Sequence, residues 1–249
     1  MLRKLFDWIY APVAGVVLVV VATLACVIVI AGPTLAVRRE LARFGVRLVL
    51  ASMGVPLTVR GLQQLPPGAC IVVANHASYL DGLVLAAALP RRFSFVVQDG
   101  AASWPLVGLT LRRMGAIFVN RASAHSSARL TRQLMRRLHR GEPLAMFAEG
   151  TFKADPGLLP FKNGAFLMAA RTGVPVVPVG IRGTRRLLGG GRRLPRWSAV
   201  HIELQPPLHA DGPGRDAAAR LRDRARARVL ALCAEPDLHL SQAVADAEV

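Results

Sequence analysis

A histidine and an aspartate stand five positions apart in the stretch CIVVANHASYLDGLVLAAAL, residues 70–89. Five residues turn a regular helix by about 500°, so His76 and Asp81 would not share one face of a helix. We therefore expect Asn75 and His76 in the loop after a strand, and Asp81 in the first turn of the next helix. A carboxylate at Nδ1 fixes the imidazole tautomer and stabilises the imidazolium once Nε2 takes a proton. The pair predicts a general base, and a capping or otherwise satisfied loop histidine is the alternative for these two residues alone.

Further polar residues follow short apolar runs in the same manner. Arg121 follows AIFV, and a guanidinium at a strand end can bind a phosphate through two parallel hydrogen bonds. A surface arginine at the sheet edge is the plainer alternative for this residue. Gly150 and Thr151 follow the apolar run at 143–147 in the same way. Gly150 would allow close backbone approach of a ligand, and Thr151 would offer a hydroxyl contact. Ligands of open α/β sheets bind outside the carboxyl ends of the strands, so these residues should converge.

Ser78 lies close to His76, so a serine nucleophile is a rival chemistry. No GxSxG elbow occurs in the 249 residues, which argues against a hydrolase of that type. We expect Ser78 to hydrogen-bond the loop or its neighbouring backbone instead. The cysteines contain no CxxC and the histidines no HxxxH spacing, so we predict neither a disulfide framework, nor a metal site, nor a cofactor.

The elements that must position these residues alternate between β-rich runs and helices. We expect strands at 56–60, 70–74, 94–97, 116–119, 143–147, 175–181 and 199–205, and helices at 80–89, 104–113, 124–140, 163–172 and 213–234. This alternation predicts an α/β fold with a central, mostly parallel sheet flanked by helices on both faces. We divide the chain into an N-terminal membrane element at 1–53, a catalytic domain at 54–235 and a loose tail at 236–249.

The N-terminal element is apolar enough to enter a membrane. No charged residue occurs from Trp8 to Val37, a run longer than the roughly 20 residues of a transmembrane helix. The run is also too long for the apolar core of a signal peptide. Basic residues flank it on both sides, Gly32-Pro33 breaks it, and residues 35–53 form an amphipathic helical pattern. A hairpin that returns to the same membrane face therefore fits better than a single span, which is the alternative.

The chain carries 32 Lys and Arg against 15 Asp and Glu, a formal net charge of +17. Such an excess favours a polyanionic partner, either an anionic membrane surface or nucleic acid. The arginines of 124–140 and 213–234 lie on amphipathic patterns, typical of a solvated basic face or of a face toward lipid headgroups. Aromatic residues make up only 6% and no zinc or RNP-like motif appears. We therefore expect no nucleic-acid partner, and a basic membrane-anchored nucleic-acid-binding protein is the remote alternative.

Four ordered blocks complete the pattern. They are NHASYLDG, GAIFVNR at 115–121, FAEGTF at 147–152 and VPVVPVGI at 174–181. Together they resemble the glycerolipid acyltransferases with the HxxxxD motif, typified by 1-acyl-sn-glycerol-3-phosphate acyltransferase (lysophosphatidic acid acyltransferase). The resemblance covers roughly residues 55–210.

The resemblance implies acyl transfer from acyl-CoA or acyl carrier protein to the free hydroxyl of 1-acyl-glycerol-3-phosphate, which gives phosphatidic acid. His76 would be the general base and Asp81 its orienter, without a covalent acyl-enzyme because the donor is already activated. Glu149 would hold Arg121 or accept from an acceptor hydroxyl. The blocks assign acceptor or phosphate binding to Arg121, Glu149, Gly150 and Thr151, and supporting places to Asn75, Gly115 and Pro178.

The third block departs from the family's usual FPEGTR. Ala148 replaces a proline, and Phe152 stands where many phosphatidate-forming members have an arginine. Either Lys153, one position on, or Lys162 supplies the missing charge, or the acceptor is another lysolipid such as a lyso-aminolipid.

We expect a membrane location, with the catalytic domain on the cytoplasmic side of a bacterial inner membrane.

Overall fold

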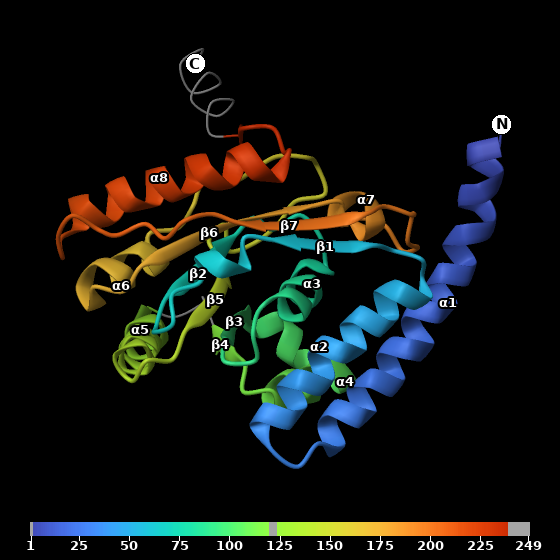
Figure 1. The fold of residues 1–249 in the computed structure, drawn as a ribbon, viewed down its shortest axis with the longest axis horizontal. Coiled ribbons are helices and arrows are strands. Elements are labelled where there is room, and N and C mark those ends of the chain that lie inside the picture. Colours follow the sequence, from blue (N-terminus) through green and yellow to red (C-terminus); the bar gives the residue numbers. More distant parts are fainter. Residues whose placement is uncertain (1, 120–123, 239–249) are drawn as a thin grey trace.

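The computed structural model describes residues 2–119 and 124–238. The chain opens with two antiparallel helices, α1 (Leu2–Ala31) and α2 (Leu35–Ser52), which form a hairpin (Figure 1). The predicted break at Gly32-Pro33 separates them, and Thr34 then caps α2 by accepting from the Val37 N–H. Within α1, the stretch Phe6–Ala31 is long and apolar enough to cross a membrane. This apolar N-terminal helix suggests membrane association.

Seven strands form one sheet in the order β1-β7-β6-β2-β5-β3-β4. Their bounds are β1 (Leu57–Arg60), β2 (Ile71–Ala74), β3 (Ser94–Gln98), β4 (Ile117–Val119), β5 (Leu144–Phe147), β6 (Val176–Arg182) and β7 (Val200–Leu204). Each predicted strand is present, and every pairing is parallel except β6 with β7. The predicted α/β class with a mostly parallel sheet is therefore confirmed.

The longer helices also match the predicted ranges. They are α3 (Asp81–Ala88), α4 (Pro105–Arg113), α5 (Ala124–His139), α6 (Gly164–Thr172) and α8 (Arg215–Cys233). Sequence reasoning missed α7 (Thr184–Leu188) and two 3₁₀ turns, η1 (Leu62–Gln64) and η2 (Asp99–Ser103). These segments are shorter than two helical turns, so they show no apolar period.

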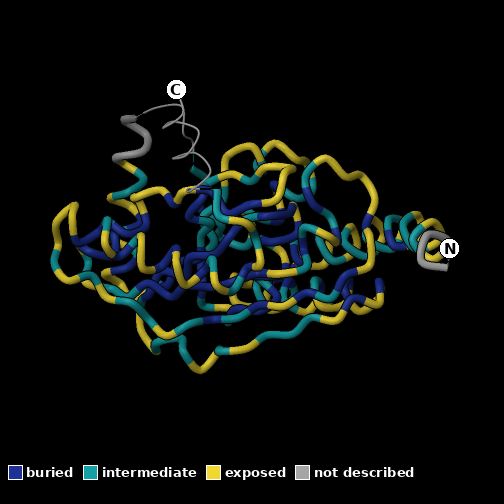
Figure 2. The backbone as a smooth tube through the Cα atoms, turned by 90° about the horizontal axis from the view of Figure 1, so that it is seen from above, coloured by how far each residue is buried: buried dark blue, intermediate teal, exposed yellow. Residues whose placement is uncertain are grey.

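Both faces of the sheet are covered, which explains why β2 is apolar along its whole length. Val72 and Ala74 pack with residues of α1, α2 and α3, whereas Ile71 and Val73 pack with residues of α5, α6 and α8. All of β2 is buried, and Figure 2 shows the buried backbone at the centre of the molecule. The central strand therefore delivers its carboxyl end to a rigid position between two helical layers.

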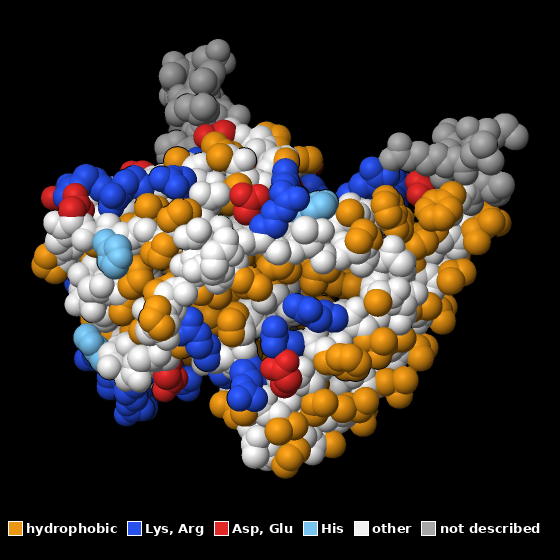
Figure 3. All heavy atoms as spheres, in the orientation of Figure 1, with side chains coloured by type: hydrophobic (Ala, Val, Ile, Leu, Met, Phe, Trp, Pro, Cys, Tyr) orange, Lys and Arg blue, Asp and Glu red, His pale blue; other side chains and the backbone are white. Residues whose placement is uncertain are grey.

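The hairpin is attached to the sheet domain through arginines of α2. Arg39 donates to the Met114 carbonyl at 3.0 Å and to Ser94 Oγ at 2.8 Å, and Arg47 donates to the Ala87 carbonyl at 3.1 Å. The outer edge of the hairpin is apolar by contrast (Figure 3). Large exposed side chains on α1 are Phe6, Trp8, Ile9, Val13, Val16, Val19, Val20, Leu24, Val27 and Ile28. Some of the positive charge of α2 thus serves internal contacts.

Candidate active site

His76 lies in the loop after β2, and Asp81 is the first residue of α3. Nδ1 of His76 is 2.9 Å from Oδ2 of Asp81, which is fully buried. The same carboxylate oxygen accepts from the N–H groups of Ala77 at 2.6 Å and Ser78 at 2.7 Å. The loop backbone therefore holds the Asp81 carboxyl group against Nδ1, which leaves Nε2 as the ring nitrogen for proton transfer.

Ser78 belongs to the same loop and is fully buried. Its Oγ donates to the Leu188 carbonyl at 2.6 Å and accepts from the Leu80 N–H at 3.1 Å. Both contacts are with the backbone, as the sequence predicted. Ser78 thus secures the loop to the end of α7, and its geometry does not suit a nucleophile.

Glu149 follows β5, the strand that pairs with β2, and it is 2% exposed. Its Oε1 accepts from the His76 N–H at 2.6 Å, and its Oε2 accepts from the Leu159 N–H at 2.8 Å. Burial raises its pKa to about 7; the two hydrogen bonds oppose the shift, and the nearby Asp81 and Glu235 charges add to it. The carboxylate thus joins two loops through their backbones.

Asn75 ties the same loop to β6 on its other side. Its Nδ2 donates to the Ile181 carbonyl at 3.0 Å, and its Oδ1 accepts from the Ile181 N–H at 2.7 Å. Pro178 lies within β6, buried and in register with Val73. The loop of His76 is therefore bound to β6 through Asn75 and to the residue after β5 through Glu149.

The His76 imidazole contacts two phenylalanine rings. Phe147 stacks on it at a centroid distance of 4.1 Å and an interplanar angle of 13°. Phe152 approaches at 4.6 Å, tilted by 55°, and the Tyr79 ring meets Phe152 edge-on at 4.9 Å. Sequence reasoning missed the contacts of Phe147 with His76 and of Tyr79 with Phe152, because rings that meet from segments far apart in the sequence leave no local pattern.

The remaining predicted residues occupy different places. Gly150 has φ +78°, as the turn after β5 requires, and Thr151, Lys153 and Lys162 are exposed around the loop that follows. Gly115 precedes β4, so it lies at the opposite end of the parallel strands from His76, where it faces Arg39 and Leu35 of α2. Arg121 lies outside the described residues.

No group of three or more His, Cys, Asp and Glu side chains forms a metal site within residues 2–119 and 124–238. The titratable pair at the carboxyl end of β2 is the His76 imidazole with the Asp81 carboxylate. The arrangement suits removal of a proton from a hydroxyl by Nε2, with the resulting imidazolium held beside Asp81.

Known proteins resemble this chain over the region that carries the site. A family model described as Acyltransferase matches residues 56–182. The chain is 32% identical over 154 residues to a chloroplastic 1-acyl-sn-glycerol-3-phosphate acyltransferase of Brassica napus, a match that covers 61% of the chain and 44% of that relative. It is 30% identical over 209 residues to the lyso-ornithine lipid O-acyltransferase of Pseudomonas aeruginosa, covering 76% and 77%.

The match thus spans less than half of the Brassica relative. Among solved structures, the 1-acyl-sn-glycerophosphate acyltransferase of Thermotoga maritima superposes with a TM-score of 0.69. That superposition covers 91% of this chain and 97% of the other, at 22% sequence identity. The two proteins therefore share a fold over most of their length.

Proposed function

The chain belongs to the acyltransferase family, and we propose that it acylates the free hydroxyl of a lysolipid from a thioester donor, acyl-CoA or acyl carrier protein. The observation that carries this proposal is the His76–Asp81 pair at the carboxyl end of β2, at 2.9 Å. An alcohol is a poor nucleophile until its proton is removed, and a partly exposed, oriented imidazole is suited to remove it. The donor is already activated, so no serine or cysteine nucleophile is required.

The proposed reaction consists of two proton transfers by His76. The acceptor oxygen attacks the thioester carbonyl carbon while Nε2 takes the hydroxyl proton. The tetrahedral intermediate then collapses, the C–S bond breaks, and the imidazolium returns the proton to the departing thiolate. Asp81 stabilises the imidazolium between these steps, because its charge lies against Nδ1 and is held by two backbone N–H groups.

The leading acceptor is 1-acyl-glycerol-3-phosphate, which would give phosphatidic acid in phospholipid biosynthesis. The names of several relatives support this choice. We assign the acceptor phosphate to Arg121 together with Lys153 and the polar groups of Gly150 and Thr151. Glu149 has a different part in this proposal, since both of its oxygens bind backbone N–H groups and position the loop of His76.

A second candidate acceptor is a lyso-aminolipid, and Phe152 favours it. An uncharged ring lies against the imidazole at 4.6 Å, at the position where many phosphatidate-forming members have an arginine. The Pseudomonas relative, which acts on a lyso-ornithine lipid by its name, matches this chain over 77% of its length. An acceptor without a phosphate next to the reacting hydroxyl would suit the uncharged Phe152 ring at this position.

We propose that the helical hairpin anchors the enzyme in a bacterial inner membrane with the sheet domain on the cytoplasmic side. The exposed apolar side chains of α1 support insertion, and the net charge of +17 supports contact with anionic lipid headgroups. The lysolipid acceptor would then reach His76 from the bilayer, while the water-soluble donor would arrive from the cytoplasm.

The test is a direct assay of the purified full-length enzyme in vesicles. A radiolabelled acyl-CoA or acyl carrier protein is offered with lysophosphatidate, a lyso-ornithine lipid or other lysophospholipids, and the acylated products are separated. We expect an ester product from lysophosphatidate or the lyso-ornithine lipid. Failure to acylate any lysolipid, with either donor, would refute the proposal.

A further inference from the structure

The β5–α6 loop, residues 150–162, carries Phe152 and Lys153 past the imidazole of His76. It contains no helix or strand of its own. A segment of this kind holds one conformation only where its backbone groups are bound from outside. Glu149 and Ala148 bind the end of this loop, and its earlier part is bound by residues beyond the part of the chain that matches the family model, which ends at residue 182.

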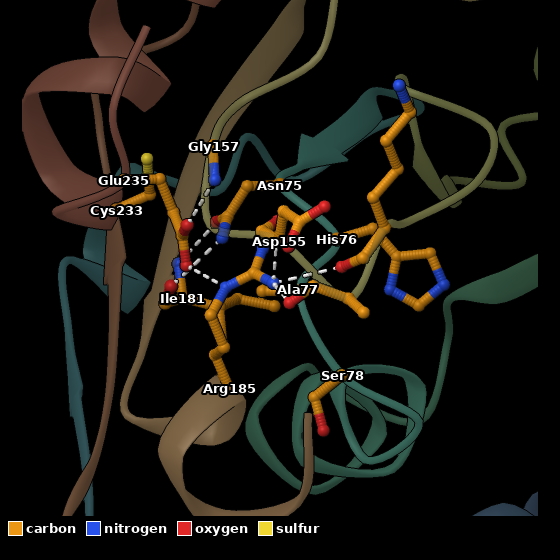
Figure 4. Close-up of polar contacts among 12 residues, drawn as sticks. Asn75, His76, Ala77, Ser78, Asp155, Gly157, Ile181, Arg185, Cys233 and Glu235 are labelled. Atoms are coloured by element: carbon orange, nitrogen blue, oxygen red, sulfur yellow. Dashed lines mark hydrogen bonds and ion pairs between the residues drawn. The ribbon is translucent and has the colours of Figure 1, made fainter. Parts of the chain in front are cut away.

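Arg185 of α7 binds the first half of the loop. Its Nη1 donates to three consecutive carbonyls, those of Lys153 at 2.9 Å, Ala154 at 3.1 Å and Asp155 at 3.1 Å. Its Nε donates to Oε1 of Glu235 at 2.7 Å, just after α8 (Figure 4). The two side chains are 17% and 10% exposed, so solvent screens this pair little.

Glu235 binds the middle of the loop with its second oxygen. Oε2 accepts from the Gly157 N–H at 2.7 Å, so one carboxylate joins the loop to Arg185. Gly157 has φ +146°, and a Cβ there would collide with the Leu238 side chain. Glycine at this position thus permits both the backbone conformation and the approach of the C-terminal segment.

The residues after α8, 235–238, form what we term the C-terminal strap. The Leu158 N–H donates to the Pro236 carbonyl at 2.8 Å, and Asp237 pairs with Arg226 of α8 at 2.6 Å. Arg226 is buried and also donates to the Leu158 carbonyl at 2.8 Å. Residues 236–238, which the sequence analysis placed in a loose tail, are therefore bound to the loop.

The hydrogen bonds continue from the C-terminal strap to His76, the proposed general base. Next to Leu158, the Leu159 N–H donates to Glu149, whose other oxygen accepts from the His76 N–H. The strap, the β5–α6 loop and the loop of His76 are thus connected through hydrogen bonds of 2.6–2.8 Å.

We propose that Arg185 and Glu235 are positioning residues, which hold Phe152 and Lys153 at the place where the acceptor binds beside His76. The acceptor part of this inference rests on the proposed function. Preorganised groups bind a substrate without an ordering cost, so release of the loop weakens acceptor binding most. The site is then built from both ends of the catalytic domain.

The test is Glu235→Gln in the full-length enzyme in vesicles, with two measurements. Hydrogen exchange at amides 153–159 reports the loop directly, without need of activity. Steady-state kinetics with lysophosphatidate and with the lyso-ornithine lipid report the site. We expect faster exchange in 153–159 and an acceptor KM raised by about 10- to 100-fold. The donor KM should stay unchanged.

Asp211→Asn is the matched control, because Asp211 forms an ion pair with Arg220 at 2.8 Å in which both side chains are more than half exposed. It should change neither measurement. Arg185→Lys keeps the charge beside Glu235 but loses the guanidinium fork, so we expect faster exchange at amides 157–159, whose N–H groups are hydrogen-bonded.

Exchange in Glu235→Gln equal to that of the control would overturn the inference, as would equal rises in both KM values accompanied by a lower melting temperature. If no lysolipid is acylated, the proposed function fails, and the exchange measurement alone decides whether these residues hold the loop.

Discussion

One oxygen of Asp81 serves His76 and the backbone of its loop together: Oδ2 lies 2.9 Å from Nδ1 and also accepts two N–H groups at 2.6 and 2.7 Å. The other oxygen, Oδ1, is buried without a hydrogen-bond partner among the described residues. The carboxylate therefore combines two tasks that substitutions at the two residues can separate, namely holding the loop and supplying charge to the imidazole.

His76→Ala removes the proposed base and leaves the buried supports of the loop in place. We expect kcat to fall by about 10²–10⁴-fold. The melting temperature and membrane binding should stay unchanged, because the imidazole is partly exposed. The control is His209→Ala, which removes an exposed imidazole. Acyl transfer retained in His76→Ala would exclude His76 as the base.

Asp81→Asn tests the charge alone. The amide oxygen can occupy the place of Oδ2 and keep its three contacts, whereas the NH₂ group takes the unpartnered place of Oδ1 at about 1–3 kcal/mol. We expect a folded enzyme with kcat reduced about 10²–10⁴-fold, because the neutral amide stabilises the imidazolium poorly. A rate close to that of the unsubstituted enzyme, measured at saturating substrates, would show that the carboxylate charge is dispensable.

Glu149→Gln tests the raised pKa of a buried carboxyl. The pKa moves from an ordinary 4.5 to about 7, so the folded protein keeps a proton that the unfolded chain has lost. Glu149 therefore contributes on the order of 3 kcal/mol to the free energy of unfolding. This contribution is fully present below about pH 4.5 and is lost as the pH rises through about 7. Thermal unfolding of both proteins from pH 5 to 8 should show this loss only in the unsubstituted enzyme. Parallel stability curves would contradict the raised pKa.

Phe152→Arg tests what faces the acceptor head group. A guanidinium can bind a phosphate through charge-assisted hydrogen bonds, each about 1.5–3 kcal/mol. We expect the kcat/KM ratio of lysophosphatidate over the lyso-ornithine lipid to rise about 10- to 100-fold. Phe152→Leu, which stays apolar and loses the ring contact with His76, should leave that ratio unchanged. An unchanged ratio in Phe152→Arg would place residue 152 away from the acceptor head group.

Val16→Arg tests the apolar edge of α1, where Val16 is 64% exposed. An arginine at the centre of a membrane helix costs about 2.5–3.5 kcal/mol. We expect part of the variant to be released by alkaline carbonate, while Val16→Leu and the unsubstituted enzyme stay in the membrane. Release of the unsubstituted enzyme would argue against anchoring by α1.

The sequence predicted the fold and the place of His76 for the same physical reason. β2 is buried on both faces, so it is an unbroken apolar run, and the first polar residues after it must leave the sheet. The strand of Glu149 ends in the same way. Its backbone partners, His76 and Leu159, were not predictable, because they belong to segments that only the folded chain brings together.

Other features left no usable signal in the sequence. In a chain with 32 Lys and Arg, nothing local distinguishes Arg185 from the arginines that solvent surrounds. Gly115 belongs to a recognisable block, yet its positive φ forms the turn that ends α4, and it faces Arg39 and Leu35 of α2 at the opposite end of the sheet from His76. A matched block therefore predicts that a residue is constrained, and only the structure tells which neighbour constrains it.

The sheet order places β1, the first strand, beside β7, the last. During synthesis α1 leaves the ribosome early and is ready to enter the bilayer, whereas β1 must wait for its partner until nearly the whole chain has emerged. Pairings of such long sequence separation form slowly. With α1 anchored in the membrane as proposed, the nascent protein would be held at the lipid surface before the strap binds the loop beside His76, and membrane insertion would precede catalytic competence.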